Sequence, residues 1–211
     1  RLQSDAKRTA DEYIAQLMPL AVKDGIQFGD VDNVWLSSVV PDANNELKRL
    51  SRKLFDTDLV EISHETLPQL SIKLPRPEEV GADRLVNAVA VMAYYKAPAI
   101  VIDFGTATTF DVVDHEGAFV GGVIAPGVNL SVNALYAAAA KLPKISISKP
   151  KKAIGDNTIT AMQSGIYWGY VSMIEGLLAR IRKQQNLDYI KVVATGGLAP
   201  LFAKAVDEIE H

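Results

Sequence analysis

Apolar and polar residues recur with a helical period in two segments near the start of the chain, and a short apolar run follows each segment. The first segment opens with a capping box, formed by Thr9 and by Glu12 three residues later. The pattern predicts the order helix, strand, helix, strand. The predicted ranges are 9–24, 34–40, 45–55 and 59–62.

A different order follows a proline-containing stretch, residues 63–79, which is predicted to be a loop or an extended edge. A helical pattern over residues 85–95 leads into the continuous apolar run 99–102, which is typical of a strand buried on both faces. The next two predicted strands are joined by short links, so these three strands should be antiparallel neighbours. The remaining predicted ranges are strands 110–113, 118–124 and 191–194 and helices 128–141, 158–184 and 198–206.

The second half of the chain is predicted as strand, strand, strand, helix, helix, strand, helix, and the first half as helix, strand, helix, strand. If the molecule consists of two similar halves, the first half lacks three opening strands. At about 8–12 residues per strand and turn, roughly 30 residues would precede Arg1. We therefore expect the chain to be the core of a somewhat longer protein.

Composition excludes several classes of function. The 211 residues are 48% hydrophobic and 22% charged, which is ordinary for a globular protein. A net charge of −3 argues against nucleic-acid binding, and the absence of cysteine excludes disulfides and thiolate chemistry. No apolar run approaches the roughly 20 residues that span a bilayer, and the start does not resemble a signal peptide. We expect a soluble, cytoplasmic protein with no membrane partner.

The strongest local signal is the end of the strand 99–102, where Asp103, Gly105 and three threonines follow an apolar run. Glycine lets a ligand approach the backbone, and threonine hydroxyls donate to phosphate oxygens without adding charge. The carboxylate could hold a cation beside that phosphate. The alternative is a tight turn whose threonines simply favour β structure.

A second signal, Gly81-Ala82-Asp83-Arg84, stands just before a helical pattern. Asp83 could accept the proton of an attacking alcohol, and Arg84 could bind a substrate carboxylate with two hydrogen bonds. The alternative is a helix-capping aspartate followed by a surface arginine.

Two weaker signals open later helices. Thr158 follows a loop that ends in Asn157, and it could donate to a ligand or merely belong to a helix cap. Gly196 and Gly197 separate a strand from a helix, a common way to lay backbone against a nucleotide. The three histidines, among them His211, show no metal-ligand spacing.

Together these segments resemble the type III pantothenate kinases in order and spacing. No single motif is specific, but the combination is, and it covers nearly the whole chain. The matching residues are 8–13, 37–41, 79–88, 102–109, 121–127, 141–143, 157–158 and 162–165.

The resemblance implies an α/β fold of two ribonuclease-H-like halves, residues 1–82 and 83–211, as in the acetate and sugar kinase–actin superfamily. It implies ATP-dependent phosphorylation of pantothenate to 4′-phosphopantothenate, the first step of coenzyme A biosynthesis, by a homodimer that uses Mg²⁺ and a monovalent cation, K⁺ or NH₄⁺.

The resemblance also assigns roles to particular residues. By similarity, Asp83 is the catalytic proton acceptor, and Gly81, Ala82, Asp83, Arg84 and Thr158 bind pantothenate. Thr106 corresponds to the ATP contact in the second phosphate motif. Asp103 corresponds to the ligand of the monovalent cation.

The sequence departs from the family pattern in two places. The family opens with Asp-x-Gly-Asn-Thr, its first phosphate motif, and that motif does not occur here. Many members also have a pantothenate-contacting tyrosine nine residues before the catalytic aspartate, where this chain has Leu74. Two alternatives therefore remain: a non-catalytic regulatory relative, as in members described as transcriptional activators, and another phosphotransferase or phosphohydrolase of the same superfold.

Overall fold

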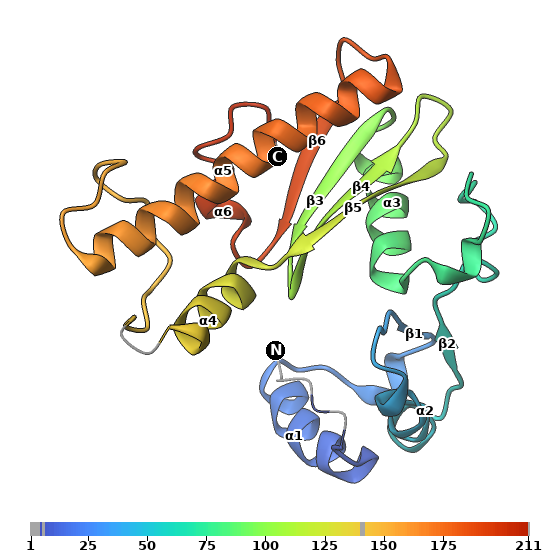
Figure 1. The fold of residues 1–211 in the computed structure, drawn as a ribbon. Helices are drawn as coiled ribbons and strands as arrows, with labels where there is room; N and C mark the ends of the chain where they lie inside the picture. Colours follow the sequence, from blue (N-terminus) through green and yellow to red (C-terminus); the bar gives the residue numbers. More distant parts are fainter. Residues whose placement is uncertain (1–4, 6, 140–141, 211) are drawn as a thin grey trace. The chain divides into compact units, whose positions relative to one another are not determined.

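The computed structural model describes residues 5, 7–139 and 142–210. The chain forms two compact units (Figure 1). The first contains the residues up to Leu70 together with Pro75–Val86, and the second contains Ser71–Leu74 and the residues from Asn87 on. The helix α3, Ala82–Tyr94, runs from the first unit into the second.

The first unit has the predicted order of elements. Its main elements are α1 (Ala10–Lys23), β1 (Val34–Leu36), α2 (Pro41–Phe55) and β2 (Leu59–Glu61), with short 3₁₀ turns at Phe28–Asp30 and Pro77–Glu79. The strands β1 and β2 pair in parallel. The Thr9–Glu12 capping box is present, so this sequence prediction is confirmed.

The helix α2 begins four residues earlier than the pattern predicted. Pro41 occupies its first turn, where the missing N–H costs nothing because that group has no partner within a helix. Proline was interpreted as the end of a strand, and β1 is correspondingly shorter than predicted. The buried side chains Ala10, Tyr13 and Leu50 join α1 to α2.

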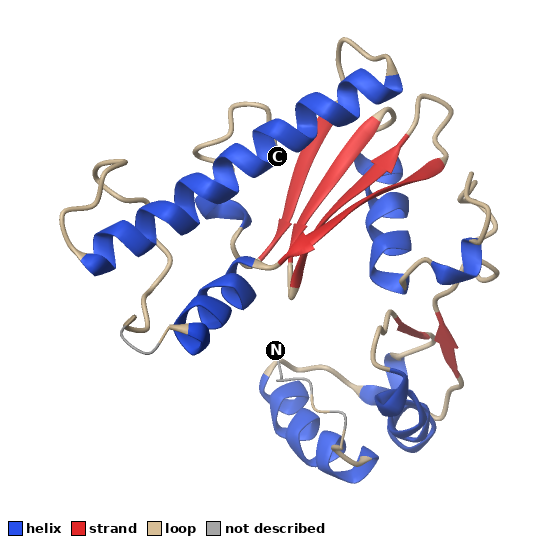
Figure 2. Ribbon diagram, viewed as in Figure 1, coloured by secondary structure: helices blue, strands red, loops and turns tan. Residues whose placement is uncertain are grey.

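The second unit is built on one four-stranded sheet (Figure 2). Its strands are β3 (Ala99–Phe104), β4 (Ala107–Val113), β5 (Phe119–Pro126) and β6 (Lys191–Gly196), in the order β5-β4-β3-β6. The strands β3, β4 and β5 are antiparallel, as predicted, and β6 pairs with β3 in parallel. This pairing brings Asp103 beside Thr195.

The long helix α5, Thr158–Gln185, lies along one face of this sheet (Figure 1). Tyr167, Ile174 and Leu178 of α5 are fully buried against β3, β4 and β6, and Phe104 stacks on Phe202. These apolar side chains of α5 are therefore used within the chain.

The opposite face of the sheet carries the alternate residues of the same strands. On β4, Phe110 and Val112 point toward α5, so Thr109 and Asp111 face the other way. Asn87 of α3 contacts Asp111 on that face. The sheet is thus covered by α5 on one side and by the part of α3 from Asn87 on at the other.

Two shorter helices complete the second unit. The helix α4, Val128–Ala138, follows β5, and the four-residue α6, Ala199–Phe202, follows β6. The pattern predicted a final helix over residues 198–206, and the observed helix is much shorter. Among the described residues, no helix combines the length and apolar character needed to cross a membrane.

Candidate active site

The turn between β3 and β4 forms the centre of the candidate site. Asp103 is the last but one residue of β3, and the exposed residues Gly105 and Thr106 make the turn. The Gly105 N–H donates to the Ala107 carbonyl oxygen at 3.0 Å, which closes the hairpin. Asp103 is partly exposed, so its carboxylate is accessible beside the turn.

Two glycines from other elements approach this turn closely. A methyl group on Gly127, at the start of α4, would overlap the carbonyl group of Thr106. A methyl group on Gly196, at the end of β6, would lie 2.6 Å from the Phe104 carbonyl oxygen and 2.8 Å from Asp103 Oδ1. The turn, the β5–α4 junction and the end of β6 therefore converge on Asp103 and Thr106.

The three threonines after Asp103 have different environments. Thr106 is exposed in the turn, but Thr108 is completely buried and the Thr109 hydroxyl donates to Asp111 Oδ2 at 3.4 Å. Of the threonines considered as phosphate donors, Thr106 is therefore accessible and Thr108 is not. The reason is that β4 begins at Ala107, so the later threonines belong to the strand.

The segment Gly81–Arg84 forms the start of α3 in the first unit. The Gly81 carbonyl accepts from the N–H groups of Arg84 and Leu85 at 3.1 and 3.2 Å. Asp83 is exposed, and its Oδ1 accepts the Arg84 N–H at 2.9 Å. A methyl group on Gly81 would lie 2.6 Å from that oxygen, so the glycine leaves room for the carboxylate. Asp83 is thus a residue of the first helical turn and not the residue preceding the helix.

Negative charge is favoured at this place. The first N–H groups of a helix have no partner within it, and the helix dipole adds partial positive charge there. The carboxylate of Asp83 accepts one of these N–H groups and is exposed to solvent. This arrangement suits a group that accepts a proton from a bound alcohol.

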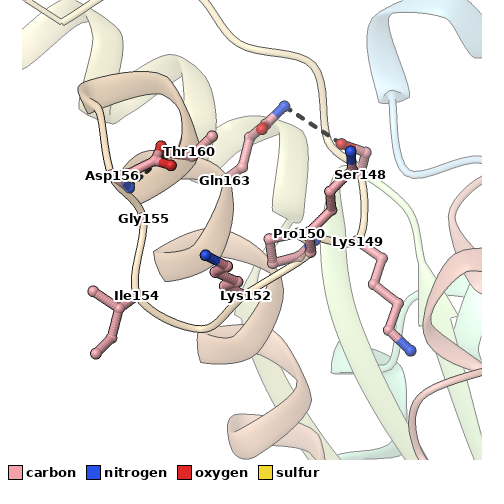
Figure 3. A pocket seen from close by; sticks show the side chains of 10 residues that line it. Ser148, Lys149, Pro150, Lys152, Ile154, Gly155, Asp156, Thr160 and Gln163 are labelled. Atoms are coloured by element: carbon pink, nitrogen blue, oxygen red, sulfur yellow. Dashed lines mark hydrogen bonds between the residues drawn. The ribbon is translucent and has the colours of Figure 1, made fainter.

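Thr158 is the first residue of α5. The loop before α5 and the first turns of this helix line a cavity of about 530 Å³ (Figure 3). Asn157 caps the helix by accepting the Thr160 N–H at 3.0 Å, and Thr158 is exposed. Gln163 ties the loop to α5 by donating to the Ser146 carbonyl at 3.1 Å. Thr158 itself is not among the residues that line the cavity, which are Ser148, Lys149, Pro150, Lys151, Lys152, Ile154, Gly155, Asp156, Thr160 and Gln163.

The end of β6 brings its backbone close to the β3–β4 turn, and only a short helix follows it. Gly196 has a φ of 93°, which glycine adopts without strain, and it lets the chain pass close to Phe104 and Asp103. The helix that follows, α6, has only four residues. Its dipole is therefore small, and it would add little to a nucleotide contact at its N-terminus.

Sequence analysis missed Asp111. This carboxylate has no exposed surface, and it stands in the buried run Phe110–Val113, whose other residues are apolar. A carboxylate in the middle of such a run is the signal that could have identified it, because burying a charge requires specific partners.

The β3–β4 turn offers few groups that could hold a metal ion. In the part of the chain that the structure describes, no three His, Cys, Asp or Glu residues gather to hold a metal ion. At the β3–β4 turn, Asp103 offers one carboxylate and Thr106 offers one exposed hydroxyl. The backbone of Gly127 and Gly196 packs closely against this turn. Lys141 and His211, named in the sequence predictions, lie outside the described residues.

Comparison with known proteins identifies relatives over the whole chain. The chain is 53% identical to the type III pantothenate kinase of Paramagnetospirillum magneticum, over 99% of this chain and 80% of that protein. It is 47% identical to the corresponding Caulobacter vibrioides enzyme, over all of this chain and 81% of that protein.

A solved structure supports the fold. A Campylobacter jejuni protein described as a Baf family transcriptional activator superposes with a TM-score of 0.55 at 17% identity, over 89% of this chain and 79% of that one. At this identity the likeness concerns the mixed α/β fold alone. The family model for type III pantothenate kinase matches residues 1–180. The chain therefore belongs to the type III pantothenate kinase family.

Proposed function

We propose that this protein is a pantothenate kinase, which transfers the γ-phosphoryl group of ATP to the primary alcohol of pantothenate and forms 4′-phosphopantothenate. The observation that carries the proposal is the family match over residues 1–180, which includes every residue assigned to the site from the sequence. The product would enter coenzyme A biosynthesis.

Asp83 is the proposed proton acceptor. A primary alcohol is a poor nucleophile until its proton has an acceptor, and phosphoryl transfer otherwise depends mainly on positioning and charge stabilisation. The exposed carboxylate of Asp83, at the start of α3, has the charge and accessibility for this role. The role of Gly81 would be to leave space for that carboxylate.

Arg84 and Thr158 are proposed to bind pantothenate. A guanidinium group matches the geometry of a carboxylate with two parallel hydrogen bonds, so Arg84 suits the acid end of the substrate. Ala82 would contribute backbone to the same pocket. The exposed hydroxyl of Thr158 would donate to a polar group of the substrate.

The β3–β4 turn is proposed to hold the phosphates. Thr106 would donate to a phosphate oxygen, while Gly127 and Gly196 keep side chains away from the turn. Asp103 would hold K⁺ or NH₄⁺ beside them. When bound, ATP would supply the phosphoryl group, and Mg²⁺ would neutralise part of the charge of the phosphates.

The proposed molecule is a cytoplasmic homodimer of two such chains, each half of the chain being related to ribonuclease H, as in actin-like ATPases. The mixed α/β fold and the family relationship support the two-half architecture. We infer no role in nucleic-acid binding, since the net charge is −3.

A coupled ADP-release assay tests the function. The gene product, expressed from its natural start codon, should release ADP only when pantothenate is added, and mass spectrometry should detect one phosphate on pantothenate. ADP release that does not depend on pantothenate would indicate a phosphohydrolase. A folded protein that binds neither pantothenate nor ATP would favour the regulatory alternative.

A further inference from the structure

Asp111 is a buried carboxylate that the proposed reaction does not use. It lies on β4, pairs with Val101 of β3 and with Gly122 of β5, and has no exposed surface. Burying a charge is costly unless hydrogen bonds compensate for the lost water. The contacts of Asp111 should therefore matter for the fold around it.

One of these contacts reaches a helix that carries proposed catalytic residues. Asn87 of α3 donates through Nδ2 to Asp111 Oδ2 at 3.4 Å, and the Thr109 hydroxyl donates to the same oxygen at 3.4 Å. Asn87 lies one helical turn after Asp83 in α3. The hydrogen bond at Asn87 therefore holds the same helix, α3, that carries the proposed proton acceptor Asp83.

Packing between α3 and the sheet is incomplete at one place, although Leu85, Ala88 and Val91 of this helix are buried. A cavity of about 220 Å³ lies between α3 and the sheet, bordered by Asn87, Val91, Val101 and Thr195 among others. Where packing is incomplete, a helix can shift along its axis at small cost, whereas a directional hydrogen bond resists such a shift. A slip of one residue moves a helix by about 1.5 Å and rotates it by about 100°.

We propose that Asp111 is a positioning residue, which sets the register of α3 on β4 through Asn87 and thereby orients Asp83 and Arg84. This inference rests on the proposed function of those two residues. A displacement of about 1 Å in a catalytic group can cost about 10²-fold in rate. The pair Asn87–Asp111 would therefore influence catalysis without touching the substrate.

A reciprocal exchange of the two side chains tests this role. Asp111→Asn and Asn87→Asp should each lower kcat/KM for pantothenate by about 10- to 100-fold. The Michaelis constant for ATP should stay within about twofold, because the β3–β4 turn is not altered. The double variant Asn87→Asp/Asp111→Asn restores one amide and one carboxylate and should recover most of the loss. A purely structural role predicts normal kinetics in the folded fraction of each variant.

Asp114→Asn is a matched control. Asp114 is a largely buried carboxylate just beyond β4, and Lys73 binds it at 2.7 Å. This variant should lower the melting temperature and leave kcat/KM for pantothenate unchanged. Loss of activity equal to that of Asp111→Asn would overturn the inference, since it would reflect general damage to the sheet.

Hydrogen exchange tests the register independently of activity. Asp111→Asn should accelerate exchange of amides in α3, whereas Asp114→Asn should do so near Lys73 and the β4–β5 turn. Unchanged exchange in α3 would overturn the positioning role even if the enzyme is active. If the wild-type protein does not phosphorylate pantothenate, the proposed function fails, and the exchange result still decides whether Asp111 holds α3.

Discussion

The carboxylate of Asp83 serves the helix that carries it and remains accessible. Its carboxylate accepts the Arg84 N–H at 2.9 Å, yet the side chain is exposed. The sequence left a helix-capping role and a catalytic role open, and the local geometry is compatible with both. Kinetics and stability have to be measured together to separate them.

Asp83→Asn should lower kcat by about 10²–10⁴, because a positioned general base typically contributes that factor. The ATP affinity should change little, and the lost helix-terminal charge should cost about 1 kcal/mol of stability at most. Steady-state kinetics and thermal melting of the same preparation measure both effects. A destabilised enzyme with normal turnover would refute the catalytic assignment.

Arg84→Ala should behave differently in the same assay. Loss of a two-pronged carboxylate contact should appear chiefly as a raised Michaelis constant for pantothenate. A lowered kcat with an unchanged Michaelis constant would argue against the proposed substrate contact.

Gly196 permits the close approach between β6 and the β3–β4 turn. Gly196→Ala would place a methyl group against Asp103 Oδ1 and the Phe104 carbonyl, and it would hold a non-glycine residue at a φ of 93°. Such backbone strain costs about 1–3 kcal/mol, so thermal unfolding should show that loss together with reduced activation by K⁺. Gly197→Ala is the control, because a methyl group there meets nothing within 4 Å. Equal effects of the two substitutions would contradict this explanation.

Asp103 offers one carboxylate among neutral donors, where the proposed phosphates carry several negative charges. A weakly hydrated monovalent ion enters such a site at lower cost than a divalent ion, which dehydrates reluctantly. Activity should therefore rise with K⁺ or NH₄⁺ and much less with Na⁺, in assays at constant ionic strength. Equal rates in the three salts would exclude this role for Asp103.

At the scale of elements, periodicity predicted the order of strands and helices, but the preferences of single residues decided where these elements begin and end. Pro41 was interpreted as a strand terminator, but it begins α2, since proline suits the first helical turn. The three threonines after Asp103 were considered together as phosphate donors, but strand alternation turns Thr108 inward. Asp111 was missed because its partner Asn87 comes from a distant segment, which a local pattern does not reveal.

The extended segment Ser71–Leu74 shows how such distant pairings form. The Lys73 N–H donates to the Phe119 carbonyl at 2.9 Å, and Phe119 N–H donates to the Ser71 carbonyl at 2.8 Å. Leu74 lies near Gly121 of β5. Lys73 Nζ also binds Asp114 and Glu116, at 2.7 and 2.5 Å. Backbone hydrogen bonds and the ion pairs of Lys73 therefore hold this segment against the sheet.

The stability that Asp114 contributes should depend on pH. Burial acts to raise its pKa, but hydrogen bonds from Lys73 and from the Ala118 and Glu116 N–H groups outweigh it, and the pKa lies below its ordinary value. A lowered pKa gives stability that is present above the ordinary pKa of about 3.9 and is lost as pH falls through the folded-state pKa.

Asp114→Asn should therefore cost about 1–3 kcal/mol at neutral pH, as expected for a hydrogen bond to a charged group. The difference in melting temperature from the wild type should be constant down to about pH 5 and should shrink below about pH 4. Asp58→Asn is the control, because Asp58 pairs with Arg52 on the surface and should contribute little. A difference that is independent of pH would contradict this explanation.

At the scale of the whole molecule, exposed apolar side chains indicate where a second subunit could bind. The apolar side of α5 packs on its own sheet, so that stripe offers little to a second subunit. The helix α4 is different, because most of its apolar side chains are exposed, including Leu130 at 52% and Tyr136 at 50%. Ile124 at the neighbouring edge strand β5 is 64% exposed. An apolar helix beside an edge strand is a surface that a twofold mate could cover.

The last prediction is that the protein is a dimer in which α4 contributes to the interface. Sedimentation velocity at micromolar concentration should show a dimer, and Leu130→Glu should weaken it at least tenfold, about 1.4 kcal/mol, because the charge would be buried without a partner. Val22→Glu on α1 is the matched control, since Val22 is an exposed apolar helix residue, 73% accessible, in the other unit. If the wild type is a monomer, the homodimer proposal fails. If Leu130→Glu leaves the dimer intact, α4 is excluded and another surface must join the subunits.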